Sequence, residues 1–325
     1  MLDYARWPFR LLTVLLAALV LIGCKKDKTG VALKGDVSLT LDWRPEPEFG
    51  GFYQAKLSHE YDNRGLRVSI INGSAGAPTW QLVANGKTDF ATTAADQVLL
   101  ARSQGADVVA LFAVYQTSPQ GVMVHEDRDF RKMQDVFTNT GTLGAENNPW
   151  LKFLLAKYGK PIVQITSDPQ GIGVFLARKD YSQQCFVTSE PILVEHEGVA
   201  SRTFLVADEG FNPYVTVLIT SGKILRDNPD LVNKMVAACH AGWQEYLDSP
   251  SAANKVMHEL NHDMDLKTFE DAADAQKRLI QNEFTLKNGL GVMTLARWKT
   301  LAQQLVDLKV MDKAPPAEAC FVNPK

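Results

Sequence analysis

Cysteine is scarce in this sequence, and only one long apolar run occurs, close to the N-terminus. The four cysteines in 325 residues are widely and irregularly spaced, which does not describe a disulfide framework or a zinc cluster. The formal net charge of −3 gives no sign of a nucleic-acid partner. A P-loop, a G-x-G-x-x-G fingerprint and a G-x-S-x-G elbow are missing after the expected strands. The sequence therefore predicts a globular chain without those motifs and without a resident metal or cofactor.

The apolar run near the N-terminus predicts an export signal. It covers twelve residues, 11–22, follows the charged start of the chain, and is too short to span a bilayer. It ends in Leu-Ile-Gly followed by Cys24, which resembles the lipobox of bacterial lipoproteins. We expect a signal peptide over 1–23, lipidation of Cys24 and a polar tether over 24–35. This predicts an exported protein, lipid-anchored at the cell envelope on the periplasmic side or the cell surface. A plain secretory signal and a retained short anchor are the alternatives.

The remaining chain is long enough for two lobes. Without residues 1–23 it has 302 residues and a formal net charge of −4, and its length exceeds what one core usually fills. Alternating strands and helices over 37–114 predict an α/β fold with mostly parallel sheets. The stretches 115–120 and 204–214 are candidate crossovers between the lobes. We therefore predict lobe 1 from 36–116 and 210–325, with lobe 2, 117–209, inserted into it and able to close like jaws.

The stretch from Ser38 to Ala55 is the strongest candidate for a binding site. Its strand alternates apolar and polar residues up to Trp43, where two prolines end it. The double glycine Gly50-Gly51 permits close backbone approach. A cluster of aromatic side chains in such a turn cannot all point inward, and four lie within eleven residues: Trp43, Phe49, Phe52 and Tyr53. We expect at least two of them to line a cleft that holds a flat ring.

One catalytic-looking motif occurs far downstream. His258-Glu259-Leu260-Asn261-His262 matches H-E-x-x-H, in which two histidines on one helix face bind zinc and the glutamate acts as base. However, Asn261-His262-Asp263 is poor helix-interior sequence and predicts that the helix ends near Asn261. The two imidazoles would then not share a face. We interpret the match as coincidental, and zinc hydrolysis stays an alternative function.

Four segments carry a resemblance to a known family. They are LDWRPEPEFGGFYQA, GSAGAPTWQLVANGKTDFATTAADQVLLARSQGADVVA, CFVTSEPILVEHEG and GFNPYVTVLITSGKILRDNPDLV. In their order and spacing they resemble the NMT1/THI5-like family of solute-binding proteins that serve ABC importers. Members bind thiamine-pyrimidine precursors, riboflavin, or alkanesulfonates and nitrate. The resemblance implies a periplasmic-binding-protein fold of type II with a two-strand hinge, a monomer, and an inner-membrane ABC permease as partner.

The resemblance also implies a set of ligand-binding residues. In lobe 1 these are Trp43, Arg44, Phe49, Tyr53, Ser74 within the turn 73–76, Asp96 and Gln97; in lobe 2 and the return crossover they are Asn147, Glu190, Asn212 and Tyr214. Carboxylates at positions 96 and 190 suit a ligand with ring amino or imide donors and would repel a sulfonate or nitrate. We therefore expect a small aromatic heterocycle, a thiamine-pyrimidine precursor or a riboflavin-like vitamin.

Two alternatives remain open at this stage. One branch of the family is an enzyme that builds the thiamine pyrimidine with a lysine, a histidine and a cysteine cluster. This chain offers Thr93 and Gln97 at the first two positions and Gly210-Phe211-Asn212-Pro213 at the cluster, so we predict that it is not an enzyme. An anion-binding protein is the other alternative, and Arg44 is the residue that would favour it.

Overall fold

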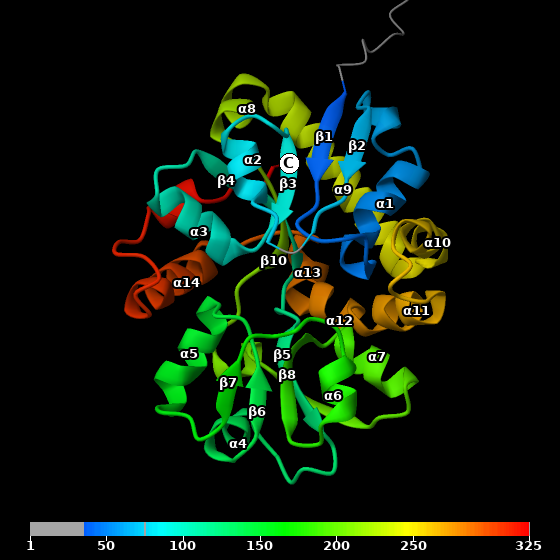
Figure 1. Cartoon of the computed structure of the whole chain (residues 1–325). Helices are drawn as coiled ribbons and strands as arrows, with labels where there is room; N and C mark the ends of the chain where they lie inside the picture. The colour runs from blue at the N-terminus through cyan, green and yellow to red at the C-terminus, as the bar shows by residue number, and fades with distance from the viewer. Residues whose placement is uncertain (1–35, 75, 325) are drawn as a thin grey trace, which may run out of the picture. The chain divides into compact units, whose positions relative to one another are not determined.

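A computed structural model describes residues 36–74 and 76–324 of the chain (Figure 1). The expected signal peptide, Cys24 and the tether lie outside these residues. No helix in the described ranges has both the length and the apolar character needed to cross a bilayer. The three cysteines of this part, Cys185, Cys239 and Cys320, are buried and unpaired.

Five strands form the sheet of lobe 1, in the order β2-β1-β3-β10-β4. Their bounds are β1 Val37–Thr40, β2 Val68–Ile71, β3 Phe90–Thr93, β4 Val108–Tyr115 and β10 Val215–Ser221. Strand β1 pairs in parallel with β2 and β3, whereas β10 runs antiparallel to β3 and β4. Four of these strands come before lobe 2 in the sequence and one comes after it.

Lobe 2 has a five-stranded sheet of its own, in the order β7-β6-β8-β5-β9. Its strands are β5 Gln120–His125, β6 Thr142–Gly144, β7 Gln164–Thr166, β8 Tyr181–Phe186 and β9 Ser201–Leu205. Strand β6 is parallel to β7 and β8, while β5 is antiparallel to β8 and β9. Figure 1 shows the two sheets as separate groups of strands: β1, β2 and β3 of lobe 1 run from blue to cyan, β10 of the same sheet is yellow-green, and β6, β7 and β8 of lobe 2 are green.

The predicted α/β fold with two lobes is confirmed, with one correction. Each sheet is mixed rather than mostly parallel, because the strand that follows each crossover enters its sheet in the opposite direction. The crossovers join β4 to β5 and β9 to β10. The alternation of strands and helices identified the parallel pairs and gave no information about the direction of β5 and β10.

Helices cover both sheets. Lobe 1 has α1 Gly50–Leu57, α2 Thr79–Ala84, α3 Ala95–Ser103, α8 Gly222–Asp227, α9 Pro229–Asp248, α10 Ser251–Leu260, α11 Leu266–Ala275, α12 Lys277–Ile280, α13 Glu283–Asn288 and α14 Leu295–Asp307. Lobe 2 has α4 Met133–Thr138, α5 Pro149–Tyr158, α6 Gly173–Ala177 and α7 Glu190–His196. Short 3₁₀ turns lie at η1 Pro47–Phe49, η2 Asp62–Arg64, η3 Ala207–Glu209 and η4 Ala317–Ala319.

The glycine pair after the first strand packs against a helix. A Cβ atom on Gly51 would lie 2.2 Å from the indole of Trp243 in α9, and one on Gly242 would lie 2.2 Å from the Gly51 carbonyl oxygen. Helix α9 begins at Pro229, where the Asn228 side chain accepts a hydrogen bond from the backbone N–H of Leu231 at 3.4 Å. The close approach expected of Gly50-Gly51 is therefore an approach between helices α1 and α9.

Three short helices, α11, α12 and α13, follow one another over 266–288. Helix α11 ends at Ala275, and Gln276, which is fully buried, follows it. The Gln276 amide donates to the carbonyl oxygen of Pro47 at 2.9 Å and accepts from the hydroxyl of Tyr115 at 2.7 Å. Buried polar atoms need such partners, so Gln276 ties the C-terminal helices to the turn that follows β1.

A candidate ligand-binding cleft

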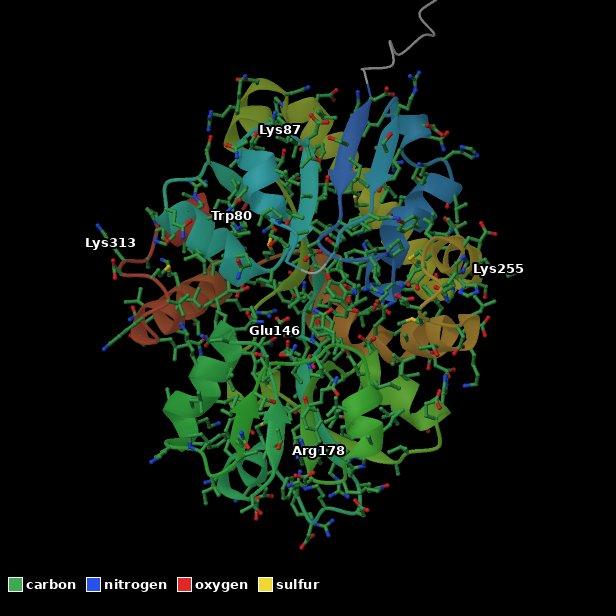
Figure 2. The ribbon with its side chains drawn as sticks, in the orientation of Figure 1. Trp80, Lys87, Glu146, Arg178, Lys255 and Lys313 are labelled. Carbon is green, nitrogen blue, oxygen red and sulfur yellow. The ribbon has the colours of Figure 1, made fainter. Side chains whose placement is uncertain are left out.

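A cavity of about 570 Å³ lies between the two lobes. We call it the acidic cavity. Lobe 1 contributes Asp42, Trp43, Arg44, Glu46, Glu48, Val215, Thr216, Asn261, Asp263 and Met264. Lobe 2 contributes Gln120, Glu146, Asn148, Gln170, Gly171, Gln184, Cys185, Phe186, Ser189, Glu190 and Leu193. Figure 2 shows Glu146 at the end of lobe 2 that faces lobe 1.

Six carboxyl groups line this cavity, and burial raises the pKa of four of them. The pKa of Glu46 is raised to about 7, first by burial and further by the charge of Glu190. Burial also raises the pKa of Glu190 to about 7 and that of Glu48 well above its usual range. At neutral pH some of these groups therefore carry protons, so they are able to donate hydrogen bonds as well as accept them.

Arg44 is the only basic side chain among the described residues that line the acidic cavity. Its guanidinium forms an ion pair with Asp263 and lies 5.3 Å from the centre of the Trp43 ring. The Trp43 indole N–H in turn donates to the Glu46 carboxyl at 3.0 Å. Because Asp263 already balances Arg44, the cavity as a whole is acidic.

Two of the carboxyl groups are held by hydrogen bonds. The Asp42 carboxyl accepts from the hydroxyl of Thr92 in β3, and the Glu190 carboxyl accepts from the backbone N–H of Phe186 at 2.8 Å. Burial raises the pKa of Asp42, although its hydrogen bond with Thr92 acts in the opposite direction. The ends of β1 and β8 thus hold these carboxyls in place from opposite lobes.

A second cavity of about 540 Å³ adjoins the first. We call it the aromatic cavity. Its lining includes the rings of Trp80, Trp150, Phe186 and Phe211, the prolines Pro78, Pro149 and Pro213, and the polar side chains of Asp42, Gln81, Thr93, Asp96, Gln97, Ser118, Gln120 and Asn148. Asp96 and Gln97 belong to the first turn of α3, where the Gln97 amide donates to Asp96 at 3.3 Å. Burial raises the pKa of Asp96.

Five of the predicted site residues line these cavities. Trp43, Arg44 and Glu190 border the acidic cavity, and Asp96 and Gln97 border the aromatic one. These residues are separated by up to almost 150 positions in the sequence, and the fold places them around the same two cavities.

Two further predicted residues are exposed next to the lining. Ser74 and Asn147 are both exposed and border neither cavity, whereas their neighbours Gly76 and Asn148 do. Gly73, which shares the turn with Ser74, donates its backbone N–H to the Trp43 carbonyl oxygen at 3.0 Å. The turn therefore supports the loop after β1 instead of presenting its donors to an anion.

The remaining predicted residues are placed in the core or at a crossover, which corrects the expectation that they face the cleft. Phe49 is fully buried, and Tyr53 is buried with its hydroxyl donating to Asn72 at 2.8 Å. Tyr214 is buried, and its hydroxyl accepts from the backbone N–H of Thr294 at 3.0 Å. Asn212 accepts from the backbone N–H of Ser118 at 2.9 Å and so joins the two crossovers.

Position within the turn explains these corrections. Phe49 ends the 3₁₀ turn η1 and Tyr53 lies in α1, both of which pack on the core beneath β1. The positions of the aromatic residues in the sequence do not predict the direction of each ring, because η1 and α1 follow one another without a regular apolar spacing. Only Trp43, which precedes the turn, reaches the cavity.

Several lining residues had no signal that singled them out in the sequence. Asp42 borders both cavities. It continues the alternation of β1, so its side chain lies on the face opposite to that of Leu41. Glu46 and Glu48, on either side of the second proline, border the acidic cavity. The alternating pattern could have identified Asp42. Thr216, on β10, has a left-handed φ of 51°, which is unusual for a β-branched residue and carries no sequence signature.

The H-E-x-x-H match lies at the end of a helix. Helix α10 ends at Leu260, and Asn261 has an extended backbone with φ of −141°. The Nδ1 atom of His258 lies 3.0 Å from the Met264 carbonyl oxygen, to which it donates. Within the described ranges no group of three or more His, Cys, Asp or Glu side chains is arranged to hold a metal ion.

Comparison with known proteins identifies the family. The model described as NMT1/THI5 like matches residues 46–253, well over half of the chain. The chain belongs to the NMT1/THI5-like family. The family expected from the four sequence segments is therefore confirmed. The matched range includes the end of the loop after β1, all of lobe 2 and all of α9.

Two proteins whose names state a ligand are similar over nearly the whole chain. The riboflavin-binding protein RibY of Chloroflexus aurantiacus is 25% identical over 304 residues, which cover 88% of this chain and 85% of that protein. A formylaminopyrimidine-binding protein of Halalkalibacterium halodurans is 23% identical over 323 residues, which cover 96% of this chain and 98% of that protein.

Solved structures show the same fold. The periplasmic aliphatic sulphonate binding protein SsuA from Escherichia coli matches with a TM-score of 0.68 at 12% identity, over 90% of this chain and 93% of that one. The desulfurization enzyme DSZB matches with a TM-score of 0.59 at 15% identity, over 88% and 96%. The chain thus has the two-lobe fold of periplasmic binding proteins, and this fold by itself does not separate binding from catalysis.

Proposed function

We propose that this chain is the solute-binding component of an ABC importer and that it holds a small aromatic heterocycle between its lobes. The observation that carries the proposal is the pair of adjoining cavities, in which aromatic rings and carboxyl groups from both lobes face one space. Rings provide a flat apolar contact, and carboxyls select ligands with N–H or O–H donors. The ligands of the two relatives, riboflavin and formylaminopyrimidine, have this chemistry.

The proposed mechanism is closure of the two lobes on the ligand. Lobe 1 comprises 36–116 and 210–325, and lobe 2 comprises 117–209, with the two crossovers acting as the hinge. A ligand that contacts both lobes favours the closed state because it binds that state more tightly. The closed form is then presented to an inner-membrane permease, and the protein acts as a monomer without a cofactor.

We further propose that Trp43, Arg44, Asp96, Gln97 and Glu190 contact the ligand. Ionised carboxylates around the acidic cavity disfavour a sulfonate or nitrate, since like charges repel at short range. Arg44 does not reverse this preference, because Asp263 is paired with it.

Thermal-shift screening tests the ligand class. Pyrimidines, flavins and alkanesulfonates are added separately to the purified protein, and a ligand raises the melting temperature according to its affinity and concentration. We expect stabilisation by a pyrimidine or a flavin that is reduced in Glu190→Gln. Glu197→Gln, an exposed position just after the same helix, serves as the matched control. Stabilisation by sulfonates alone would contradict the proposal.

Export and lipid attachment form a separate part of the proposal. The signal peptide 1–23, lipidation at Cys24 and the tether 24–35 would hold the protein at the cell envelope. Mass spectrometry of the mature N-terminus and fractionation of cells that express Cys24→Ala test it. We expect loss of the lipid and release of the variant from the membrane fraction; membrane association that persists in the variant would argue against a lipid anchor.

A further inference from the structure

The acidic and aromatic cavities together form one extended site. Their volumes of about 570 and about 540 Å³ each lie in the range of roughly 300 to 1,000 Å³ that is usual for small-molecule sites. Five residues border both cavities: Asp42, Gln120, Asn148, Phe186 and Val215. A ligand with a single ring would occupy part of one cavity and leave the other to solvent.

The aromatic cavity has the chemistry for a flat ring. Trp80, from α2, is half-buried and packs on the core of lobe 1, while Trp150, from α5 of lobe 2, is buried (Figure 2 labels Trp80). Asp96 and Gln97 lie at its border and offer an acceptor and an amide, which suits the polar edge of a heterocycle. Aromatic surface with a few convergent polar groups is the usual composition of a ring-binding site.

The acidic cavity has a different chemistry. Its aromatic lining consists of Trp43 and Phe186, and it has many hydrogen-bonding side chains, among them the carboxyls of Glu46, Glu48 and Glu190. A carboxyl whose pKa is about 7 exists at neutral pH in both protonated and ionised forms, as for Glu46 and Glu190. A hydroxyl group both donates and accepts, so it can pair with either form.

We propose that the ligand has two parts, a flat aromatic ring system in the aromatic cavity and a chain of several hydroxyl groups in the acidic cavity. This inference rests on the proposed function and narrows its ligand class to heterocycles that carry a polyhydroxyl chain. Asp96 and Gln97 contact the edge of the ring, and Glu46 and Glu190 contact the chain. Asp42, which borders both cavities, lies where the chain joins the ring.

Calorimetric titration with matched compounds tests the two-part ligand. Riboflavin carries ring and chain, lumichrome has the same three fused rings in the alloxazine form without the chain, and ribitol is the chain alone. A simple aminopyrimidine represents the single-ring ligands. We expect riboflavin to bind about 100-fold more tightly than lumichrome, since several hydrogen bonds to carboxyl groups are lost with the chain. Ribitol alone should bind too weakly to measure.

Two variants assign the parts of the ligand to the cavities. Glu46→Gln should weaken riboflavin binding at least tenfold and change lumichrome binding less than twofold. Trp80→Ala should weaken both compounds by a similar factor, because it removes a contact with the ring. Glu197→Gln, exposed and outside both cavities, should change neither.

The outcomes separate this inference from the proposed function. Equal affinity for riboflavin and lumichrome, or tightest binding of the aminopyrimidine, would overturn the two-part ligand while leaving an aromatic heterocycle as the cargo. An equal loss of affinity for both flavins in Glu46→Gln would overturn the assignment of the chain to the acidic cavity. If none of the ring compounds binds, the proposed function itself fails.

Discussion

The two lobes contribute to the cleft in different ways. Lobe 1 offers a loop after β1 whose side chains are half-buried and tied to one another, as in the hydrogen bond from Trp43 to Glu46. Lobe 2 offers turns that include the exposed side chains of Glu146 and Gln170. Groups that are held before binding lose less freedom when the ligand arrives. Lobe 1 should therefore contribute most of the affinity, and lobe 2 should complete the site on closure.

The largest expected effect is on ligand binding from lobe 1. Trp80→Ala should weaken binding of the best ligand from the screen by about 30-fold or more, as expected for a ring at the centre of a contact surface. Gln170→Ala, in an exposed turn of lobe 2, should weaken it less than fivefold. Titration of both variants measures the difference, and a larger loss for Gln170→Ala would reverse the assignment of the lobes.

The next effect concerns the strained backbone where β10 enters lobe 1. Thr216 has a left-handed φ of 51°, which glycine adopts at no steric cost. Thr216→Gly should therefore be more stable than Thr216→Ala by about 1 kcal/mol. Thr220, on the same strand, is the control, because there glycine should be less stable than alanine. Chemical denaturation of the four variants gives the comparison, and the same order at both sites would disprove strain at position 216.

A smaller effect is expected on the pH dependence of stability. The pKa of Glu190 is about 7 in the folded protein and near 4.5 when exposed, so between these values the folded state binds more protons. Stability of the ligand-free protein should consequently increase as the pH falls from 8 to 5. The rise in melting temperature should be smaller in Glu190→Gln by roughly 3 °C, whereas Glu197→Gln should follow the wild type. Parallel curves for wild type and Glu190→Gln would show that burial does not shift this carboxyl.

The smallest effect is expected at a contact between the lobes outside the cleft. His196, at the end of α7, lies 2.8 Å from the Asp271 carboxyl and 3.0 Å from the Thr268 hydroxyl, both in α11. His196→Ala should weaken ligand binding about twofold, since partly exposed polar contacts contribute little. Titration measures the affinity, and small-angle scattering reports whether the lobes separate. An unchanged affinity would mean that the contact does not favour closure.

The sequence predicted which segments form strands and helices better than it predicted the direction of each strand in its sheet. Alternation in Val37, Leu39 and Leu41 identified β1, because such alternation is a local signal. The antiparallel direction of β5 and β10 depends on how the crossovers return, which no local pattern encodes. The break between α11 and α12 at Gln276 likewise depends on partners more than 150 residues away.

The candidate site was predictable in part. Resemblance to the family indicated Trp43, Asp96 and Glu190, all of which border the cavities. Phe49 and Tyr53 were expected beside Trp43, yet they are buried, because side-chain direction within a short turn depends on what packs beneath it. The acidity of the cavity arises from groups far apart in sequence, such as Glu48 and Asp263, and only the fold reveals it.

The position of β10 has a consequence for the order in which the molecule is assembled. β10 lies between β3 and β4, but it is made only after all of lobe 2. A growing chain can therefore complete the sheet of lobe 2 before that of lobe 1, although lobe 1 begins first. Until β10 arrives, β3 and β4 each have an unpaired edge, and such edges promote association between chains. Because lobe 2 is inserted before β10, lobe 1 stays incomplete while lobe 2 is synthesised. During that period the unpaired edges of β3 and β4 are open to pairing with other chains.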